Sequence, residues 1–156
     1  MNTAAILSPC RTYRYSLTRE WGSGIAVLFV GLNPSTADET SDDPTIRRCI
    51  GFAREWGYAR LHMANLFAFR STDPSGMKNA SDPIGPENDM HLLALANDSA
   101  LTVAAWGTHG TFGGRHSTVR KMLPRLHYLR LTKDGHPGHP LYLPKSLRPI
   151  EWKQEA

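Results

Sequence analysis

The chain has 156 residues, of which 40% are hydrophobic and 21% charged, and these values are typical of a single globular domain with a full core. No apolar run approaches the roughly 18 residues that a membrane-spanning helix needs, and residues 1–9 lack the basic and apolar regions of a secretory leader, so we expect a cytoplasmic protein with no membrane partner. The net charge of +4 permits nucleic-acid binding without requiring it.

The first predicted element is an edge strand or hairpin arm over residues 11–21, where tyrosine and arginine alternate. We interpret its role as structural. A continuous apolar run follows over residues 25–30, and it is rich in valine and isoleucine. Such a run is typical of a strand buried on both faces, as in a parallel sheet covered by helices.

This buried strand runs straight into the turn Gly31-Leu32-Asn33-Pro34, which a polar loop follows. Loops at the carboxyl ends of parallel strands are where α/β proteins bind ligands. The turn therefore predicts a site. An ordinary turn would also use Gly31 for tight backbone geometry and Asn33 for a local hydrogen bond, so this alternative stays open.

The rest of the chain alternates predicted helices and strands. Predicted helices cover residues 44–56, 86–98 and 115–123, and predicted strands cover residues 60–67, 101–106 and 126–131. Because crossovers between parallel strands are right-handed, this order predicts a three-layer α/β/α sandwich with a four-stranded, mostly parallel central sheet.

We expect one domain over residues 1–156. Within it, residues 1–22 form the edge strand or hairpin arm and residues 23–144 the α/β core. Residues 145–156 form a C-terminal tail that packs on the core.

Four polar or aromatic residues lie at or just beyond the same ends of the predicted strands, and we expect Asn33, Asn65, Trp106 and His136 to line a common crevice. Asn65 would hydrogen-bond a base edge, while Phe67 and Trp106 would stack on a flipped base. Each has a structural alternative, because asparagine often closes a strand into a turn and aromatic residues at strand ends are often core residues.

The last loop, residues 132–144, combines stiffening prolines with His136 and His139. A histidine here would stabilise a developing oxyanion or donate to a carbonyl, and Asn33 would orient a water for attack on an acetal-like carbon. The alternative is a stiff loop whose histidines cap backbone carbonyls.

Together, Gly31-Leu32-Asn33-Pro34 and the His-Pro segments resemble the paired motifs of the uracil-DNA glycosylase superfamily. The resemblance implies a uracil-DNA glycosylase-like fold, a water-positioning role for Asn33 and support of the leaving base by His136 or His139. Two registers, His136-Pro137-Gly138 and His139-Pro140-Leu141, fit the second motif, and the second would make Leu141 a wedge in the base stack. The substrate-binding residues expected around these motifs are Gly31, Leu32, Pro34, Ser35, Thr36, Asn65, Phe67, Trp106 and Leu141.

The chain departs from the glycosylase pattern in two respects. Ser35-Thr36-Ala37-Asp38 stands where an aromatic-bearing segment often follows the first motif, and no iron-sulfur cysteines are present, so activity on plain uracil is not expected. A polar rim would instead read a modified base or a nucleotide; its members are Asn33, Ser35, Thr36, Asp38, Asp42 and Asp43.

The chain as a whole resembles a bacterial family known as domain of unknown function 1643, over about residues 29–144. The segments that carry this resemblance are residues 31–37, 43–45, 65–68, 85–89, 105–107 and 136–141. They identify a family but imply no activity.

The leading hypothesis is a DNA glycosylase-like enzyme that hydrolyses the N-glycosidic bond of a modified or mismatched base in nucleic acid. The alternatives are a non-catalytic nucleic-acid or nucleotide-binding module of the same fold and a hydrolase of free nucleotides. The expected partner is therefore nucleic acid, DNA in the first place, or a nucleotide. No metal or other cofactor is expected, because Cys10 and Cys49 lie far apart and no helix carries a His-x-x-x-His pair.

Overall fold

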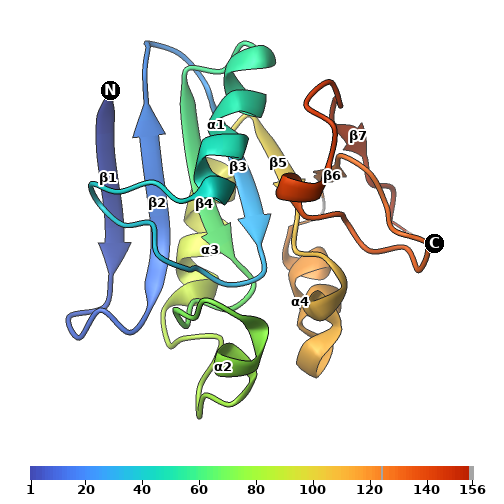
Figure 1. Ribbon diagram of the computed structural model, residues 1–156. Coiled ribbons are helices and arrows are strands. Elements are labelled where there is room, and N and C mark those ends of the chain that lie inside the picture. Colours follow the sequence, from blue (N-terminus) through green and yellow to red (C-terminus); the bar gives the residue numbers. More distant parts are fainter. Residues whose placement is uncertain (124, 155–156) are drawn as a thin grey trace.

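The structure, a computed structural model, describes residues 1–123 and 125–154, which form a mixed sheet with helices on both faces (Figure 1). The strands are β1 (Asn2–Leu7), β2 (Arg14–Glu20), β3 (Ala26–Gly31), β4 (Arg60–Asn65), β5 (Leu101–Ala104), β6 (Leu126–Tyr128) and β7 (Ile150–Glu151). The α-helices are α1 (Pro44–Glu55), α2 (Pro74–Lys78), α3 (Asn88–Asn97) and α4 (Arg115–Met122), and the 3-10 helices are η1 (Thr108–Gly114) and η2 (Pro140–Tyr142).

Within the described residues the sheet has 7 strands in the order β1-β2-β4-β3-β5-β6-β7. The central strands β4, β3, β5 and β6 are parallel, whereas β1, β2 and β7 are antiparallel to their neighbours. The prediction of a four-stranded sheet is therefore wrong, although the four strands it named are the parallel ones. The flanking strands β1 and β7 escaped prediction because β1 is mostly exposed and β7 has only 2 residues, so neither has an apolar pattern of its own.

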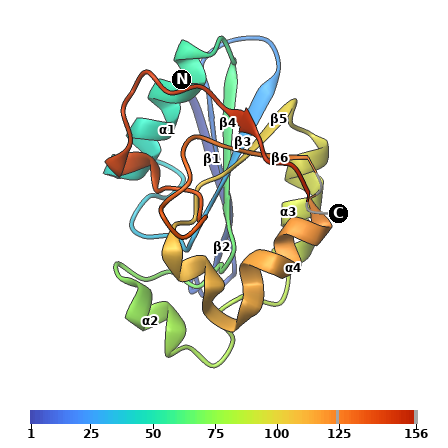
Figure 2. The same ribbon diagram turned by 90° about the vertical axis from the view of Figure 1, so that its right-hand side faces the viewer.

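The apolar run of β3 is continuous because both of its faces are buried. Val27 and Phe29 pack in a cluster with α1, while Leu28 and Val30 pack in a second cluster that includes residues of α2, α3 and α4. Figure 2 shows α1 on one side of the sheet and α3 and α4 on the other. This arrangement is the three-layer organisation expected for parallel strands covered on both faces.

Helix α1 begins where the sequence predicts. The carboxylate of Asp43 accepts a hydrogen bond from the Ile46 backbone N–H at 2.9 Å, and Pro44 occupies the first turn. The predicted helices near 86–98 and 115–123 correspond to α3 and α4. Helices α2, η1 and η2 lie in segments predicted as loops, because they are too short to show an apolar period. No helix in the described residues has the length and apolar character needed to cross a membrane.

The two ends of the chain pack on this core. β1 and β2 form an antiparallel hairpin in which β1 is the outer strand. At the other end β7 pairs with β6, and the Trp152 ring lies 5.9 Å from that of Trp106. Residues 155 and 156 of the predicted tail lie outside the described residues.

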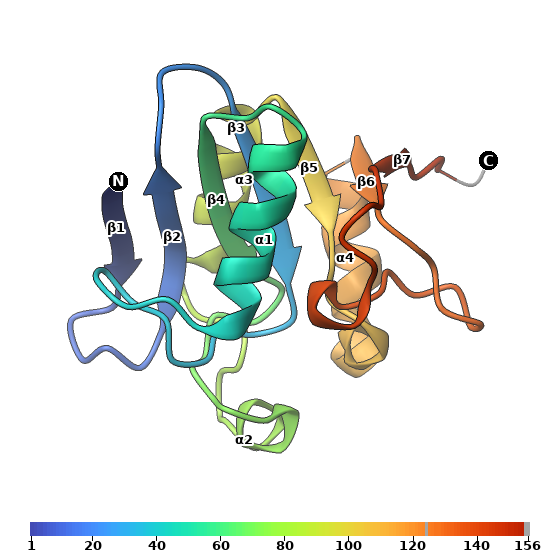
Figure 3. The ribbon, with the colours of Figure 1, turned by 45° about the horizontal axis from the view of Figure 1, so that its top comes forward.

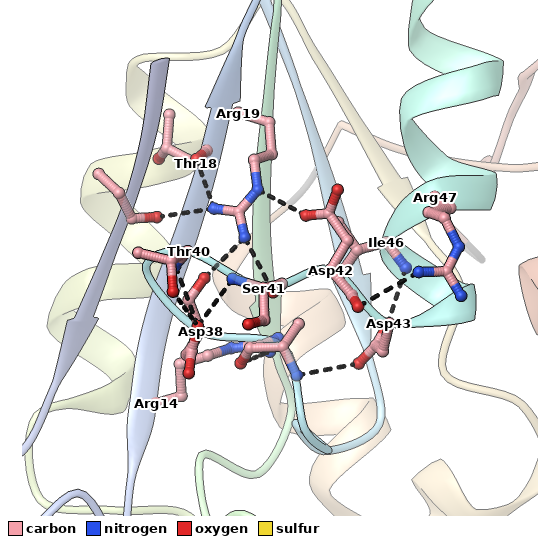
Figure 4. Close-up of polar contacts among 12 residues, drawn as sticks. Arg14, Thr18, Arg19, Asp38, Thr40, Ser41, Asp42, Asp43, Ile46 and Arg47 are labelled. Atoms are coloured by element: carbon pink, nitrogen blue, oxygen red, sulfur yellow. Dashed lines mark hydrogen bonds and ion pairs between the residues drawn. The ribbon is translucent and has the colours of Figure 1, made fainter. Parts of the chain in front are cut away.

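The loop that follows the Gly-x-Asn-Pro turn is tied to β2 by a buried arginine. Arg19 is 0% exposed, and its Nε donates to Asp42 Oδ1 at 2.7 Å (Figure 4). Nη2 donates to the carbonyls of Asp38 at 2.6 Å and Ser41 at 3.1 Å. Nη1 donates to two further carbonyls, those of Ala4 and Thr18. Every N–H of this guanidinium therefore has an acceptor.

Replacing Arg19 with Met should lower the free energy of unfolding by about 2–4 kcal/mol, because four backbone carbonyls and the Asp42 carboxylate lose their donor. Arg19→Lys should recover only part of this loss, since one ammonium cannot reproduce the planar fork. Urea titration followed by circular dichroism measures both changes. A loss below about 1 kcal/mol for Arg19→Met would show that the loop does not depend on this contact.

Candidate functional site

A cavity of about 700 Å³ opens at the carboxyl ends of β3 and β4 and beside the residues that follow β5. Its size lies within the range of small-molecule sites. Figure 3 shows that the segments after these strands, with α2 and η2, gather at this end of the sheet. This is the edge at which parallel α/β sheets bind ligands. The lining comes from both sequence motifs, the β4 end, the segment before α2 and the last loop.

The first motif delivers Asn33 to this cavity with a fixed orientation. Asn33 Nδ2 donates to the Ser71 carbonyl at 3.0 Å and to the Pro34 carbonyl at 3.2 Å. These contacts hold the amide so that its oxygen, Oδ1, has no hydrogen-bond partner among the described residues. Asn33 can therefore accept a hydrogen bond from a water or a ligand.

Gly31 ends β3 under close contact. A Cβ at this position would lie 2.9 Å from Asn65 Nδ2 and 2.9 Å from Met63 Cε. The motif needs glycine here because the side chains of Met63 and Asn65 on β4 pack against the Gly31 backbone. This packing fixes the position of Gly31 in the cavity wall.

The second motif places His139 in the same lining. His139 is the residue before η2, and its Nδ1 accepts a hydrogen bond from the Leu141 N–H at 3.2 Å. Burial lowers the pKa of His139 below its usual 6.5, while the Asp43 carboxylate opposes this effect. The ring is therefore neutral at neutral pH. Because Nδ1 is an acceptor, the single ring proton is on Nε2, which makes His139 a donor.

His136 and Phe67 do not line the cavity. His136 is half-buried, its backbone N–H donates to Thr132 Oγ1 at 3.1 Å, and its ring lies 6.4 Å from that of His116. Phe67 is 2% exposed and packs against Phe112 in the core. Of the two registers of the last motif, His139-Pro140-Leu141 is the one that lines the same cavity as the first motif.

The other predicted site residues lie in the lining, and they are Leu32, Pro34, Ser35, Thr36, Asn65, Trp106 and Leu141. Asn65 is 2% exposed, and its Oδ1 accepts a hydrogen bond from Arg14 Nη2 at 3.4 Å. Trp106 is 1% exposed, and its buried Nε1 has no partner among the described residues. The Trp106 ring therefore belongs mainly to the core, and little of it is accessible from the cavity.

Several lining residues were not predicted as site residues, among them Arg14, Ser71, Thr108, Thr132 and Tyr142. The alternation of Arg14 with tyrosines suggested a structural strand, and nothing in a single sequence separates a strand arginine that faces a cavity from one that faces solvent. Tyr142 is 83% exposed. An aromatic residue directly after the His-Pro-Leu segment was the one signal that could have indicated it.

The carboxylates of the predicted polar rim have structural partners. Asp43 lines the cavity, and its two oxygens accept backbone hydrogen bonds from Ile46 and Ala37. Asp42 pairs with Arg19, and Asp38 Oδ1 accepts from the backbone N–H groups of Thr40 and Ser41. In residues 1–123 and 125–154 no group of three His, Cys, Asp or Glu side chains could hold a metal ion.

A family model described as "Protein of unknown function (DUF1643)" matches residues 14–141. The chain belongs to this family. The match runs from the start of β2 into η2 and covers every residue that lines the cavity except Tyr142. This confirms the family resemblance seen in the sequence. No curated protein and no solved structure matches the chain.

The neutral state of His139 predicts a pH dependence of stability. Its folded-state pKa lies below the value of 6.5 expected in the unfolded chain, so the unfolded chain binds more protons as the pH falls through 6.5. Stability from this residue is complete above that pH and is lost below it. His139→Asn keeps an acceptor for the Leu141 N–H but does not titrate. Urea titrations at several pH values between about 7.5 and 5.5 should show a shallower loss in the variant than in the wild type. Equal slopes would contradict a buried neutral histidine.

Proposed function

We propose that this DUF1643 protein hydrolyses the N-glycosidic bond of a modified or mismatched base in nucleic acid and has a uracil-DNA glycosylase-like fold. One observation carries the proposal: Asn33, whose amide oxygen has no partner in the described part of the chain, and His139, a neutral donor, line the same cavity. The proposal also draws on the resemblance of both motifs to the glycosylase superfamily. In that pattern the asparagine follows the first core strand and the His-Pro motif follows the last.

The two groups fit the charge changes of this reaction. The bond between the sugar C1′ and the base nitrogen breaks, and its electron pair stays on the base as negative charge on the ring and its carbonyl oxygen. The His139 Nε2–H donates to that oxygen as the charge develops. Asn33 Oδ1 accepts a hydrogen bond from the water that attacks C1′. The water's proton passes to solvent, because an amide is not a base.

The cavity wall suits a base removed from its stack. Leu32, Pro34 and Met63 supply apolar surface beside the polar groups, and about 700 Å³ is enough for a nucleoside. Enzymes that act on a base flip it into such a pocket and read its polar edge there. The exposed Tyr142 and the half-buried Leu141 flank the mouth, where either side chain can fill the gap left in a base stack.

A basic groove beside the cavity supports a nucleic-acid substrate. It is lined by Arg47, Arg48 and Lys145, and it shares Pro44 and Leu141 with the cavity. Its basic side chains come from α1 and from the segment after η2. A phosphate backbone bound there would hold its nucleotides close to the mouth of the cavity.

Asn33→Ala should reduce the rate of base release at least about 100-fold, because the attacking water loses its orienting acceptor. The substrates would be oligonucleotides carrying mismatched thymine, deaminated purines or hypermodified pyrimidines, and the readout would be abasic sites. The loss of the Ser71 contact should lower the free energy of unfolding by only about 1 kcal/mol.

Asn97→Ala, at the exposed end of α3, is the matched control and should release base at the wild-type rate. Undiminished release by Asn33→Ala would refute the assigned role. Tight binding without release across the panel would favour a non-catalytic binding module, and release from free nucleotides alone would favour a nucleotide hydrolase.

Binding to an oligonucleotide duplex should weaken with added salt, because phosphates release counterions when basic side chains bind them. Arg47→Ala and Lys145→Ala should each reduce the slope of log K against log salt by about 1, whatever the base sequence. Arg125→Ala, at the opposite end of the sheet before β6, should leave the slope unchanged. Fluorescence anisotropy at several salt concentrations gives these slopes, and slopes equal to the wild type in both groove variants would exclude this groove as the phosphate contact.

A further inference from the structure

Arg14, at the start of β2, is a buried cation that no carboxylate of the described residues neutralises at ion-pair distance. It is 2% exposed. Nη1 donates to the Ala37 carbonyl at 3.0 Å, and Nη2 makes a long hydrogen bond of 3.4 Å to Asn65 Oδ1. Nε is buried with no partner among the described residues. No ion pair involves this guanidinium in the described part of the chain. Two of its five N–H donors are therefore used, and neither acceptor carries charge.

Arg19 on the same strand provides the contrast. Both arginines extend toward the loop over residues 37–42 (Figure 4). They share this direction because the pairing of β1 with β2 shifts register between Ile6 and Leu7, which adds one residue to β2 after Arg14. Arg19 has a full set of acceptors and a carboxylate partner. Two buried arginines that reach the same loop thus differ in their hydrogen bonding and in their charge neutralisation, and only the one without a carboxylate partner lines the cavity.

Arg14 lies on the buried floor of the cavity. Arg14 is among the lining residues that are almost fully buried, which also include Gly31, Ile46, Met63, Asn65, Ala105 and Trp106, whereas those at the mouth, such as Thr72 and Tyr142, are exposed. Arg14 also sets the direction of the Asn65 amide. Since Oδ1 of Asn65 faces Arg14, its Nδ2 is left as a donor without a partner in the described residues. The floor therefore offers donors from two side chains.

We propose that Arg14 and Asn65 form a subsite on the cavity floor that binds a negatively charged oxygen of the ligand, from a phosphate or from a carboxylate on the base. The inference deepens the proposed function and rests on it for the nucleoside part of the ligand. Charge is the reason to infer an anion rather than a neutral carbonyl. A buried guanidinium without a counter-ion lowers the stability of the folded protein, and a bound anion would reduce this penalty.

Two further observations support an anion. Burial lowers the pKa of Arg14 to about 10, and the nearby Asp43 and Asp38 offset this only in part. Asp43, the carboxylate that most opposes this lowering of the Arg14 pKa, already accepts two backbone hydrogen bonds. In addition, Arg70 lines a hollow that shares Ser35, Thr36, Ser71 and Thr72 with the cavity, so a second cation stands near the entrance.

The test is equilibrium binding by calorimetry, with the full chain and without any catalytic readout. The ligands are the common nucleosides, their 5′-monophosphates, 5-carboxydeoxycytidine and inorganic phosphate. The wild type should bind a monophosphate or the carboxylated nucleoside at least about 10-fold more tightly than the neutral parent, because hydrogen bonds to a charged oxygen are the strong ones. Preference for the monophosphates identifies a phosphate, and preference for 5-carboxydeoxycytidine identifies a base-borne carboxylate.

Arg14→Met should abolish this preference, with a melting temperature equal to or above that of the wild type, since it replaces an unneutralised buried cation by an apolar side chain. Arg19→Met is the matched comparison and should lower the melting temperature by about 5 °C or more. If Arg14→Met does not fold, Arg14→Gln replaces it, because glutamine keeps a donor for the Ala37 carbonyl without charge.

The inference is overturned if the wild type shows no preference for any anionic ligand, or if the preference is unchanged in the folded Arg14 variant. Failure of the proposed function gives a different result. Inorganic phosphate would then bind in an Arg14-dependent way while nucleosides and nucleotides showed no additional affinity. Base release from oligonucleotides without any anion preference would support the proposed function and reject the subsite.

Discussion

The saturated hydrogen bonding of Arg19 is the contact on which the cavity wall depends. The loop over residues 35–43 has no regular secondary structure, and its backbone carbonyls need donors if they are to be buried. The Arg19 guanidinium donates hydrogen bonds to two of those carbonyls and to the Asp42 carboxylate. The next residue, Asp43, caps α1. The same few residues therefore fix the loop after the first motif, the start of α1 and one side of the cavity.

The two buried arginines of β2 illustrate how a fold separates stability from binding. Arg19 forms the contacts expected of a structural residue, with every N–H paired. Arg14 is almost as buried but has donors without a partner in the described residues, which is unfavourable for the folded state alone. Natural sequences retain such conflicts mainly at functional sites. The strand that looked purely structural in the sequence thus carries one residue of each kind.

Much of the core was predictable because its signals are local. The apolar run of β3 and the Asp-Pro start and apolar spacing of α1 are periodic patterns in a single segment, and they correspond to the structure. The family was predictable for a similar reason, since it rests on short motifs read directly from the chain. The outer strands were not predictable. β1 is held by its pairing with β2, and β7 by its pairing with β6, so their stability comes from partners distant in sequence.

The cavity residues also differ in whether local sequence signals could predict their positions. Residues at or just beyond the carboxyl end of a strand, such as Asn65 and Asn33, could be placed at one edge of the sheet from strand order alone. The register of the two histidines could not, because it depends on how a proline-rich loop folds back. Arg14 could not be placed either, because its direction depends on an added residue in the β1 and β2 pairing.

The site groups also share a mode of orientation that bears on chemistry. The amide of Asn33 is held by backbone carbonyls, and the ring of His139 is held by a backbone N–H. In each case the backbone holds one end of the side chain, and the opposite end has no partner among the described residues, which leaves an acceptor at Asn33 and a donor at His139. With the donors of Arg14 and Asn65 on the floor, most of the oriented groups are donors. A cavity of this kind favours ligands that are rich in oxygen acceptors and that gain negative charge during reaction, and a purine or pyrimidine base leaving with the electron pair of its glycosidic bond is such a ligand.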